Sequence, residues 1–270
     1  MNSPYSLFDL TNRRAVITGG AGTLGGAISV AFAQAGAEVI VVDTNLERAE
    51  SIANTITNNA GKSHAFAADL SNEKDVMDLF AKIDAIGEID ILVNAVAALG
   101  KRYTPDQFPL EEWEETITSD LTSFFLTSRE AAQRMIKAGR GGSIVNFGSI
   151  AGASVLGRGG MAYGVAKAGV SQLTKECAIA WAHHKIRVNA ILPAQFINRW
   201  WDEMVHDPKH RELVERVVSG IPLGRMGNAE EIVGPALFLA SDASSMVTGA
   251  CLPVDGGNLA FNPGGTIDVI

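Results

Sequence analysis

Apolar residues along the chain fall into two kinds of segment, and the two kinds alternate. Short runs rich in valine, isoleucine and alanine are each followed by a longer stretch in which apolar residues recur at helical spacing. The short runs predict strands at residues 15–18, 39–43, 65–69, 91–95, 143–149, 188–193 and 251–255. Because these runs are almost continuously apolar, we expect the strands to be buried on both faces. The pattern predicts an α/β fold, a doubly wound, seven-stranded parallel sheet of the Rossmann type with helices on both faces.

The longer stretches predict the helices, and capping residues mark some of their ends. Two long helices are expected, at about residues 109–139 and 163–183. Ser71 is predicted to cap the helix that follows the third strand. Asn228 and Glu231 have the spacing of a capping box, in which each side chain bonds to the backbone of the other residue.

One polar segment interrupts the alternation. It holds Trp200 and Trp201 and separates the sixth strand from the last helix. The chain shows no internal repeat, low-complexity tract or linker. We therefore expect one domain over residues 1–270, with a small substrate lid inserted at about residues 195–222.

Composition and charge narrow the classes of partner. The chain has 270 residues, of which 47% are hydrophobic, and a net charge of −8. An acidic balance argues against nucleic acid and anionic membranes as partners. No apolar run reaches the ~18 residues of a membrane-spanning helix, and the N-terminal segment lacks the basic and apolar regions of a secretory signal. We expect a cytoplasmic protein without membrane or nucleic-acid partners.

The remaining composition argues against a metal. Cys177 and Cys251 lie far apart and are expected to be free thiols. No Cys/His cluster has the spacing of metal ligands, so no metal site is predicted.

A glycine-rich stretch, residues 18–26, follows the first predicted strand and begins a helix. It fits two dinucleotide-binding signatures, one through Gly20, Gly22 and Gly25 and the other beginning at Thr18 and Gly19. In either frame a pyrophosphate would meet free backbone N–H groups at the positive end of a helix. The alternative is a tight turn with glycines for packing alone.

Acidic residues at strand ends indicate which nucleotide would bind. Asp43 ends the second strand, where a carboxylate can accept hydrogen bonds from both ribose hydroxyls of adenosine and would repel a 2′-phosphate. The next residues, Thr44 and Asn45, are not basic. This pattern favours NAD over NADP. Asp69 ends the third strand and could contact the adenine, or serve only as a helix-entry residue.

Tyr163 and Lys167 lie four residues apart on one predicted helix, so one helix face presents both. A nearby ammonium favours phenolate and lowers the pKa of a tyrosine, which can then exchange a proton with a substrate oxygen. Ser149 ends the preceding strand and could hydrogen-bond that oxygen. Taken singly, these residues also fit a core tyrosine, a surface lysine and a turn serine.

With these motifs in place, the chain resembles the short-chain dehydrogenase/reductase family over about residues 8–260. The segments "AVITGG", "DILVNA", "GSIVNFGSIAG", "AYGVAKAGV", "IRVNAILP" and "TGACLPVDGG" occur in that family's order and spacing. The resemblance implies catalytic roles for Ser149, Tyr163 and Lys167. It selects the frame that begins at Thr18. The cofactor-binding residues that we expect are Gly19, Gly22, Thr23, Leu24, Gly25, Asp43, Asp69, Leu70, Asn94, Ala95, Tyr163, Lys167, Pro193 and Ile197.

The chain departs from the family pattern at a few positions. Thr23 replaces a loop glycine, and Ala194 replaces the glycine after the sixth strand. Asp120, seven residues after Trp113, stands where the family has an active-site asparagine that holds a water beside the lysine. We expect Asp120 to keep that water, to favour the cationic lysine and to raise the pKa of the tyrosine. Reduced or retuned activity is the alternative.

The substrate is less well defined. The C-terminal half resembles gluconate 5-dehydrogenases and other sugar dehydrogenases, which implies an NAD-dependent oxidoreductase (EC 1.1.1.-) acting on a sugar, polyol or sugar acid. An NAD(P)H ketoreductase of a lipid, aromatic or secondary-metabolite carbonyl, and a catalytically quiet nucleotide-binding protein, are the alternatives. A homotetramer is implied, paired through the helices at about residues 112–137 and 163–183, and a dimer is the alternative.

The substrate pocket is expected between the loops after the fourth and fifth strands and the lid. Ser149, Ala151, Tyr163, Arg199 and Trp200 are predicted to touch the substrate. Several arginines there suggest a carboxylate, sulfonate or phosphate on the substrate, or else belong to a solvated surface. The wider predicted lining adds Lys101, Arg102, Arg158, Gln195, Asn198 and Trp201.

Overall fold

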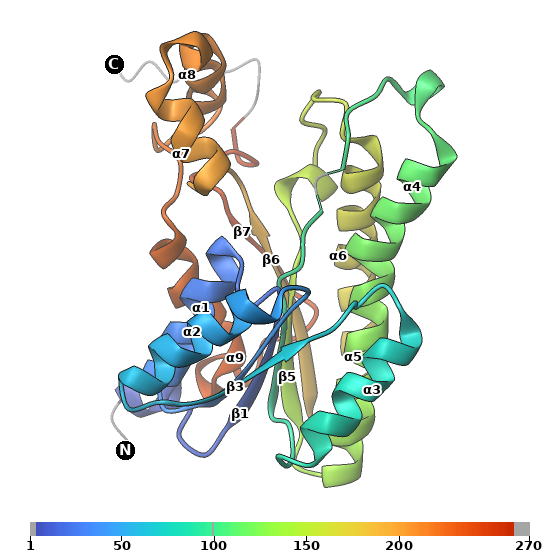
Figure 1. Cartoon of the computed structure of the whole chain (residues 1–270), viewed down its shortest axis with the longest axis vertical. Coiled ribbons are helices and arrows are strands. Elements are labelled where there is room, and N and C mark those ends of the chain that lie inside the picture. The colour runs from blue at the N-terminus through green and yellow to red at the C-terminus, as the bar shows by residue number, and fades with distance from the viewer. Residues whose placement is uncertain (1–3, 99, 262–270) are drawn as a thin grey trace.

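The computed structural model describes residues 4–98 and 100–261 and contains one parallel sheet of seven strands. The strand order is β3-β2-β1-β4-β5-β6-β7, and every neighbouring pair is parallel (Figure 1). This confirms the predicted fold class. The strands are β1 (Arg14–Thr18), β2 (Glu38–Asp43), β3 (Lys62–Ala67), β4 (Ile91–Asn94), β5 (Gly142–Phe147), β6 (Ile186–Pro193) and β7 (Cys251–Val254).

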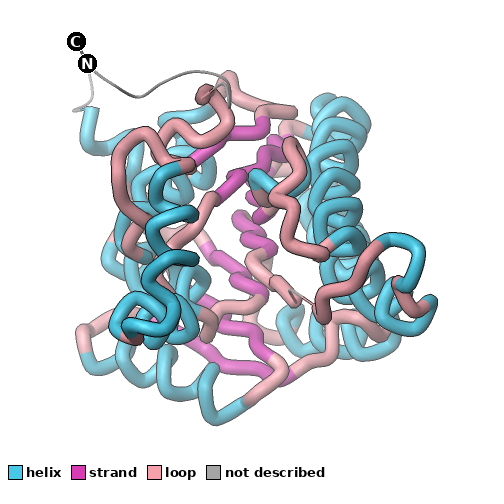
Figure 2. Tube along the Cα trace, turned by 90° about the horizontal axis from the view of Figure 1, so that it is seen from above, coloured by secondary structure: helices cyan, strands magenta, loops and turns pink. Residues whose placement is uncertain are grey.

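Helices cover both faces of the sheet (Figures 1 and 2). Buried side chains of α1, α2 and α9 pack on one face, and those of α3, α5 and α6 pack on the other. Strands β1 to β6 therefore contribute apolar residues to two cores, which explains the continuous apolar runs in the sequence. The helices are α1 (Thr23–Gln34), α2 (Leu46–Asn58), α3 (Glu73–Asp84), α4 (Leu110–Ile117), α5 (Ser123–Ala138), α6 (Met161–Trp181), α7 (Arg199–His206), α8 (Arg211–Ser219) and α9 (Val233–Ala240).

Several predicted boundaries were wrong, and they lie near the site. Strand β3 spans Lys62–Ala67, so Asp69 follows the strand instead of ending it. Strand β5 ends at Phe147, which places Ser149 in the loop after it. The helix expected at 109–139 is divided by a π-helical segment, Thr118–Thr122, between α4 and α5. The local pattern of apolar residues does not reveal such a bulge, because the helical direction continues through it.

The two predicted caps had different outcomes. The side chain of Asn72, and not that of Ser71, accepts the free N–H groups at the start of α3, from Lys74 and Asp75. Ser71 instead donates its hydroxyl to Asp69. The capping box of Asn228 and Glu231 is present and begins the turn that leads into α9.

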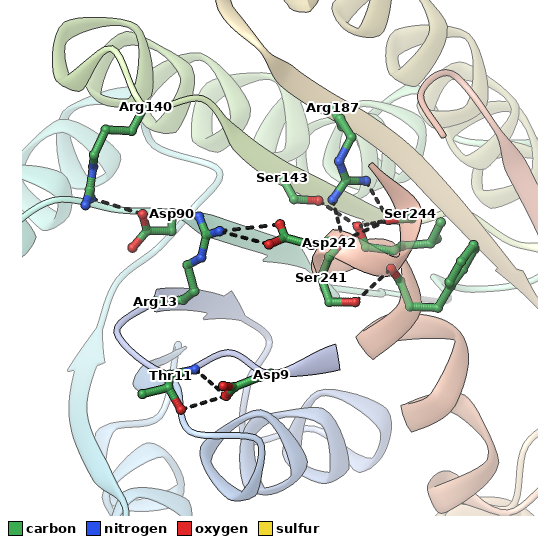
Figure 3. A network of polar contacts seen from close by, with 12 residues as sticks. Asp9, Thr11, Arg13, Asp90, Arg140, Ser143, Arg187, Ser241, Asp242 and Ser244 are labelled. Atoms are coloured by element: carbon green, nitrogen blue, oxygen red, sulfur yellow. Dashed lines mark hydrogen bonds and ion pairs between the residues drawn. The ribbon is translucent and has the colours of Figure 1, made fainter. Parts of the chain in front are cut away.

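A polar network ties together the edge of the sheet where the strands begin (Figure 3). The Asp90 carboxylate accepts hydrogen bonds from Arg140 and from the backbone N–H of Arg14. Arg187 donates to the carbonyl oxygen of Ser241 and to the hydroxyl of Ser244, beyond the end of α9. These contacts join β1 and β6 to the loops around them at one edge.

The lid has a small apolar core of its own. Helices α7 and α8 lie at the end of the molecule beyond the carboxyl ends of the strands (Figure 1). Trp201 is buried there with Val217, Ile221 and Met226. The lid is thus a packed unit, and Trp201 anchors it.

Other predictions concern the chain as a whole. Cys177 and Cys251 are both free. Within residues 4–98 and 100–261, no helix is long and apolar enough to cross a membrane. The prediction of a single domain over 1–270 extends to residues 1–3, 99 and 262–270, which lie outside the described residues.

Candidate active site

A large cavity of about 1670 Å³ opens at the carboxyl ends of the strands. Its wall includes residues that follow β1, β2, β4, β5 and β6. The strand order reverses between β1 and β4, and parallel sheets of this kind bind ligands in the crevice at such a reversal. The cavity is therefore the candidate site.

The glycine-rich turn forms one end of the cavity. Gly19 has φ +64°, and a Cβ there would lie 2.8 Å from the carbonyl oxygen of Ala95. A Cβ on Gly25 would lie only 2.1 Å from the carbonyl oxygen of Gly19. Gly19 and Gly25 are thus required by contact between backbones, which supports the sequence frame that begins at Thr18.

The N-terminus of α1 faces this turn, and no acidic side chain of its first turn neutralises its positive end. The N-cap, Gly22, makes no side-chain cap bond, and the first turn holds no acidic residue. Thr23 is the first helical residue and lines the cavity. Free N–H groups at a positive helix end, in a cradle that a Cβ would fill, fit the pyrophosphate of a dinucleotide.

Asp43, the last residue of β2, lies on the cavity wall. Its side chain is buried, lines the cavity and accepts a hydrogen bond from the backbone N–H of Asn45. Arg48, one helical turn further, also lines the cavity and donates to the carbonyl oxygen of Ala21. Arg48 is therefore hydrogen-bonded to the glycine-rich loop at the candidate site, where it was not expected from the sequence.

Most of the predicted cofactor residues line the cavity, but Asn94 does not. Its amide donates to Asn146 and Ser128, and its oxygen accepts hydrogen bonds from Thr18 and Thr127. Asn94 thus braces the ends of β1, β4 and β5 against α5. Those that line the cavity are Gly19, Gly22, Thr23, Leu24, Gly25, Asp43, Asp69, Leu70, Ala95, Tyr163, Lys167, Pro193 and Ile197.

The network around Asn94 was not recognised from the sequence. Asn146 lies near the end of β5 and donates to the hydroxyl of Thr174 in α6. Both side chains are almost fully buried. The available signal was an asparagine within the otherwise apolar run of β5, because a polar side chain there must find buried partners.

Ser149, Tyr163 and Lys167 meet on the cavity wall. The Ser149 hydroxyl accepts a hydrogen bond from the N–H of Ala151, 3.1 Å away. Lys167 is only 1% exposed, and its Nζ lies 5.7 Å from the centre of the Tyr163 ring. Helix α6 therefore presents the phenol and the ammonium to the loop that holds the serine.

The Lys167 ammonium is fully partnered. It donates to the carbonyl oxygens of Val96, at 3.0 Å, and Phe147, at 3.1 Å, and lies 3.3 Å from the Asp120 carboxylate. Asp120 is itself fully buried and accepts from the N–H of Ala98. The π-helical segment carries Asp120, and such bulges are frequent at functional sites. Asp120 is not part of the cavity wall and contacts the wall residue Lys167.

The charges around Tyr163 shift its acidity. The pKa of Tyr163 is raised to about 12, mainly by burial; the hydrogen bond with Ser149 opposes this shift, and the Asp120 carboxylate adds to it. Burial also lowers the pKa of Lys167, against the effect of Asp120. Burial raises the pKa of Asp120, against the effect of Lys167. The expected opposition between Asp120 and the phenolate is therefore present; the expected water stays a prediction.

Some of the predicted substrate residues lie on the cavity wall, and others lie outside it. Ala151, Trp200, Arg102, Arg158 and Gln195 line the cavity. Asn198 lines it too and caps α7 by accepting the N–H of Trp201.

Two predicted pocket residues lie outside the cavity wall. The Arg199 side chain is 94% exposed and pairs with Glu203 along the surface of α7. This corrects the prediction that Arg199 lines the pocket, because its helical position one residue after the cap turns it to solvent. Lys101 pairs with Glu112 instead.

Comparisons with known proteins find relatives that cover most of the chain. A family model described as enoyl-(acyl carrier protein) reductase matches residues 19–258. The D-threitol dehydrogenase of Mycolicibacterium smegmatis is 35% identical over 254 residues, which are 93% of this chain and 94% of the relative.

Solved structures with the same fold include a short-chain type dehydrogenase/reductase from Mycobacterium marinum, with a TM-score of 0.86 and 33% identity over 95% of this chain and 99% of that one. A gluconate 5-dehydrogenase from Burkholderia cenocepacia, solved in complex with NADP and tartrate, has a TM-score of 0.88 and 29% identity over 96% of this chain and 100% of that one.

The glycine-rich turn gives a direct test. Gly25→Ala should lower the free energy of unfolding by about 1–3 kcal/mol, because the new methyl group would overlap the Gly19 carbonyl. It should also weaken nucleotide binding. Gly26→Ala is the matched control, since the nearest atom to its Cβ is 3.4 Å away, and it should be neutral or stabilising by up to ~1 kcal/mol. Urea unfolding and calorimetric titration with NAD measure both; equal behaviour of the two variants would contradict this account of the turn.

Proposed function

Because the chain belongs to the short-chain dehydrogenase/reductase family, we propose that it is an NAD-dependent oxidoreductase that interconverts a secondary alcohol and a ketone. The observation that carries this proposal is the meeting of Ser149, Tyr163 and Lys167 on the wall of a cavity whose other end fits a dinucleotide. A bound nicotinamide nucleotide supplies the acceptor or donor of hydride in such a site. The residues of this chain move the proton and hold the substrate oxygen.

In the oxidative direction, the Tyr163 phenolate takes the proton of the substrate hydroxyl. In the reductive direction, the phenol returns a proton to the carbonyl oxygen. The Ser149 hydroxyl, held by the N–H of Ala151, donates a hydrogen bond to the same substrate oxygen. Lys167 places a positive charge near the Tyr163 ring and favours the phenolate.

Asp120 tunes this machinery as a positioning residue. Its carboxylate orients the Lys167 ammonium and balances its charge. Asp120 thereby favours the cationic lysine, against the effect of burial, but the phenolate gains less from that lysine. We infer that oxidation by this protein is favoured by alkaline pH.

The preference for NAD rests on Asp43. A buried carboxylate at the end of β2 suits the ribose hydroxyls and opposes a 2′-phosphate. Arg48 is engaged with the Ala21 carbonyl, so it is not free in this arrangement to pair with that phosphate. A solved relative holds NADP, so both nucleotides belong in the assay.

The substrate that we propose is a sugar, polyol or sugar acid. The relatives that act on D-threitol and on gluconate support this class. Trp200 offers a half-exposed ring on the cavity wall, against which the apolar face of a sugar could pack.

The assembly that we propose is a cytoplasmic homotetramer. Phe125 of α5 is 45% exposed, and Val165 and Ile179 of α6 are 45% and 78% exposed. Exposed apolar residues on these two long helices are suited to pairing between subunits.

The catalytic role of Tyr163 is tested by Tyr163→Phe. Removal of the hydroxyl should lower kcat by about 10²–10⁴-fold with NAD and a panel of sugars, polyols and sugar acids, because the proton loses its carrier. Calorimetry should show little change in NAD affinity. Tyr103→Phe, at another tyrosine on the cavity wall, is the control and should retain activity. Wild-type protein that oxidises no member of the panel, or full activity of Tyr163→Phe, would overturn the proposal.

The charge balance predicts a shift in pH dependence. Asp120→Asn removes a negative charge that raises the pKa of Tyr163. The rising limb of the oxidation rate against pH should therefore move to lower pH, by up to about 1 unit. The measurement is kcat/KM between pH 6 and 11 for both proteins, with thermal unfolding to confirm that the variant is folded. Superimposable profiles would show that Asp120 has no part in setting the acidity of Tyr163.

A further inference from the structure

Two loops bring Arg102 and Arg158 together on the cavity wall. Arg102 belongs to the loop after β4, and Arg158 belongs to the loop between β5 and α6. The backbone N–H of Tyr103 donates to the carbonyl oxygen of Gly159 at 3.1 Å. A Cβ on Gly159, which has φ +73°, would lie 3.3 Å from the Cβ of Arg102. The two arginines are therefore neighbours although 56 positions separate them.

Neither guanidinium has a counter-ion in the described part of the chain. Every other arginine there has a carboxylate, carbonyl or hydroxyl acceptor, as in the pairs Arg14–Glu38 and Arg225–Glu231. The remaining partnered arginines are Arg13, Arg48, Arg129, Arg134, Arg140, Arg187, Arg199, Arg211 and Arg216. Glu111, Glu114 and Glu115 line the same cavity but form no ion pair with Arg102 or Arg158. Two like charges held side by side without an acceptor are costly unless an anion joins them.

The N-terminus of helix α6 also favours an anion at this place. Helix α6 begins at Met161, three residues after Arg158, with Gly160 as its N-cap, no side-chain cap bond and no acidic residue in its first turn. Its positive end is therefore not neutralised. Burial, together with the charge of Arg102, lowers the pKa of Arg158. An anion at this place would relieve the repulsion.

Gln195 adds a polar group of a different kind. It is 8% exposed, lines the cavity, and its buried Oε1 has no hydrogen-bond partner among the described residues. A buried amide oxygen without a donor is suited to a hydroxyl group of a ligand. The wall thus offers cationic groups for an anion and an acceptor for a hydroxyl.

We propose that Arg102 and Arg158 bind an anionic group of the substrate, a carboxylate or a phosphate ester, while Ser149 and Tyr163 hold its reacting hydroxyl. The substrate is then a polyhydroxylated anion, such as a sugar acid or a phosphorylated polyol, and not a neutral sugar. This inference rests on the proposed function, which it narrows. Planar guanidinium groups bind either oxyanion in a bidentate manner, so the arms of the test separate the two sources.

The first test is steady-state oxidation with NAD, comparing glucitol as the neutral polyol, gluconate as the carboxylate and glucitol 6-phosphate as the phosphate ester. We expect one anion to have a KM at least tenfold below that of glucitol. Arg102→Gln and Arg158→Gln should each raise that KM at least tenfold, and by a larger factor than they raise the KM for glucitol. Arg199→Gln is the matched control, because its side chain lies outside the cavity, and it should behave as wild type.

The second test is calorimetric binding of the same three compounds to the NAD-saturated protein, which does not depend on turnover. Tighter binding of gluconate or glucitol 6-phosphate than of glucitol, lost in the Arg102→Gln/Arg158→Gln double variant, supports the proposal. Equal binding of all three compounds, or binding of the anion unchanged in the double variant, overturns it. If glucitol is oxidised and the anions are not preferred, the anion site fails while the proposed function stands. If an arginine-dependent anion binds but nothing is oxidised, the proposed function fails instead.

Discussion

The buried ammonium of Lys167 is the interaction on which the rest of the site depends. A charge that is 1% exposed is stable only where acceptors surround it. The acceptors are the carbonyl oxygens of Val96 and Phe147 and the carboxylate of Asp120. They come from the segment after β4, the end of β5 and the π-helical segment before α5, so one cation fixes three parts of the chain against α6. Tyr163, one turn earlier on α6, is positioned by the same contacts.

This arrangement couples structure to chemistry through charge. Asp120 favours the cationic form of Lys167, against the effect of burial, and it raises the pKa of the Tyr163 phenol. An asparagine at residue 120 would leave the cation uncompensated and favour the phenolate more strongly. Asp120 therefore makes the Tyr163 phenol less acidic, and it also holds the Lys167 ammonium in place. At the other end of the cavity, the backbone contact between Gly19 and Gly25 gives α1 an open, positive N-terminus for a phosphate.

The sequence predicted the sheet well, because strands buried on both faces leave continuous apolar runs and helices leave a different period. It predicted less of what depends on contacts between distant segments. The direct Lys167–Asp120 contact requires the π-helical bulge, which has no apolar signature. Arg199 was expected in the pocket and lies outside it. Arg102 and Arg158 were expected there, but the backbone bond between two loops that brings them together could not be predicted. Likewise, the sequence could not tell which of Trp200 and Trp201 anchors the lid. Only the packing shows that it is Trp201.

The most direct test of the central role of Lys167 is a double-mutant cycle on the free energy of unfolding. Urea unfolding at one protein concentration would compare the wild type, Lys167→Met, Asp120→Asn and the double variant. Each single change leaves a buried charge without its partner and should cost about 3–5 kcal/mol. If the two charges stabilise each other, the double variant will be more stable than the sum of the single losses by at least about 1 kcal/mol. Losses that add to within about 0.5 kcal/mol would show that the two residues do not depend on each other, and would contradict the account.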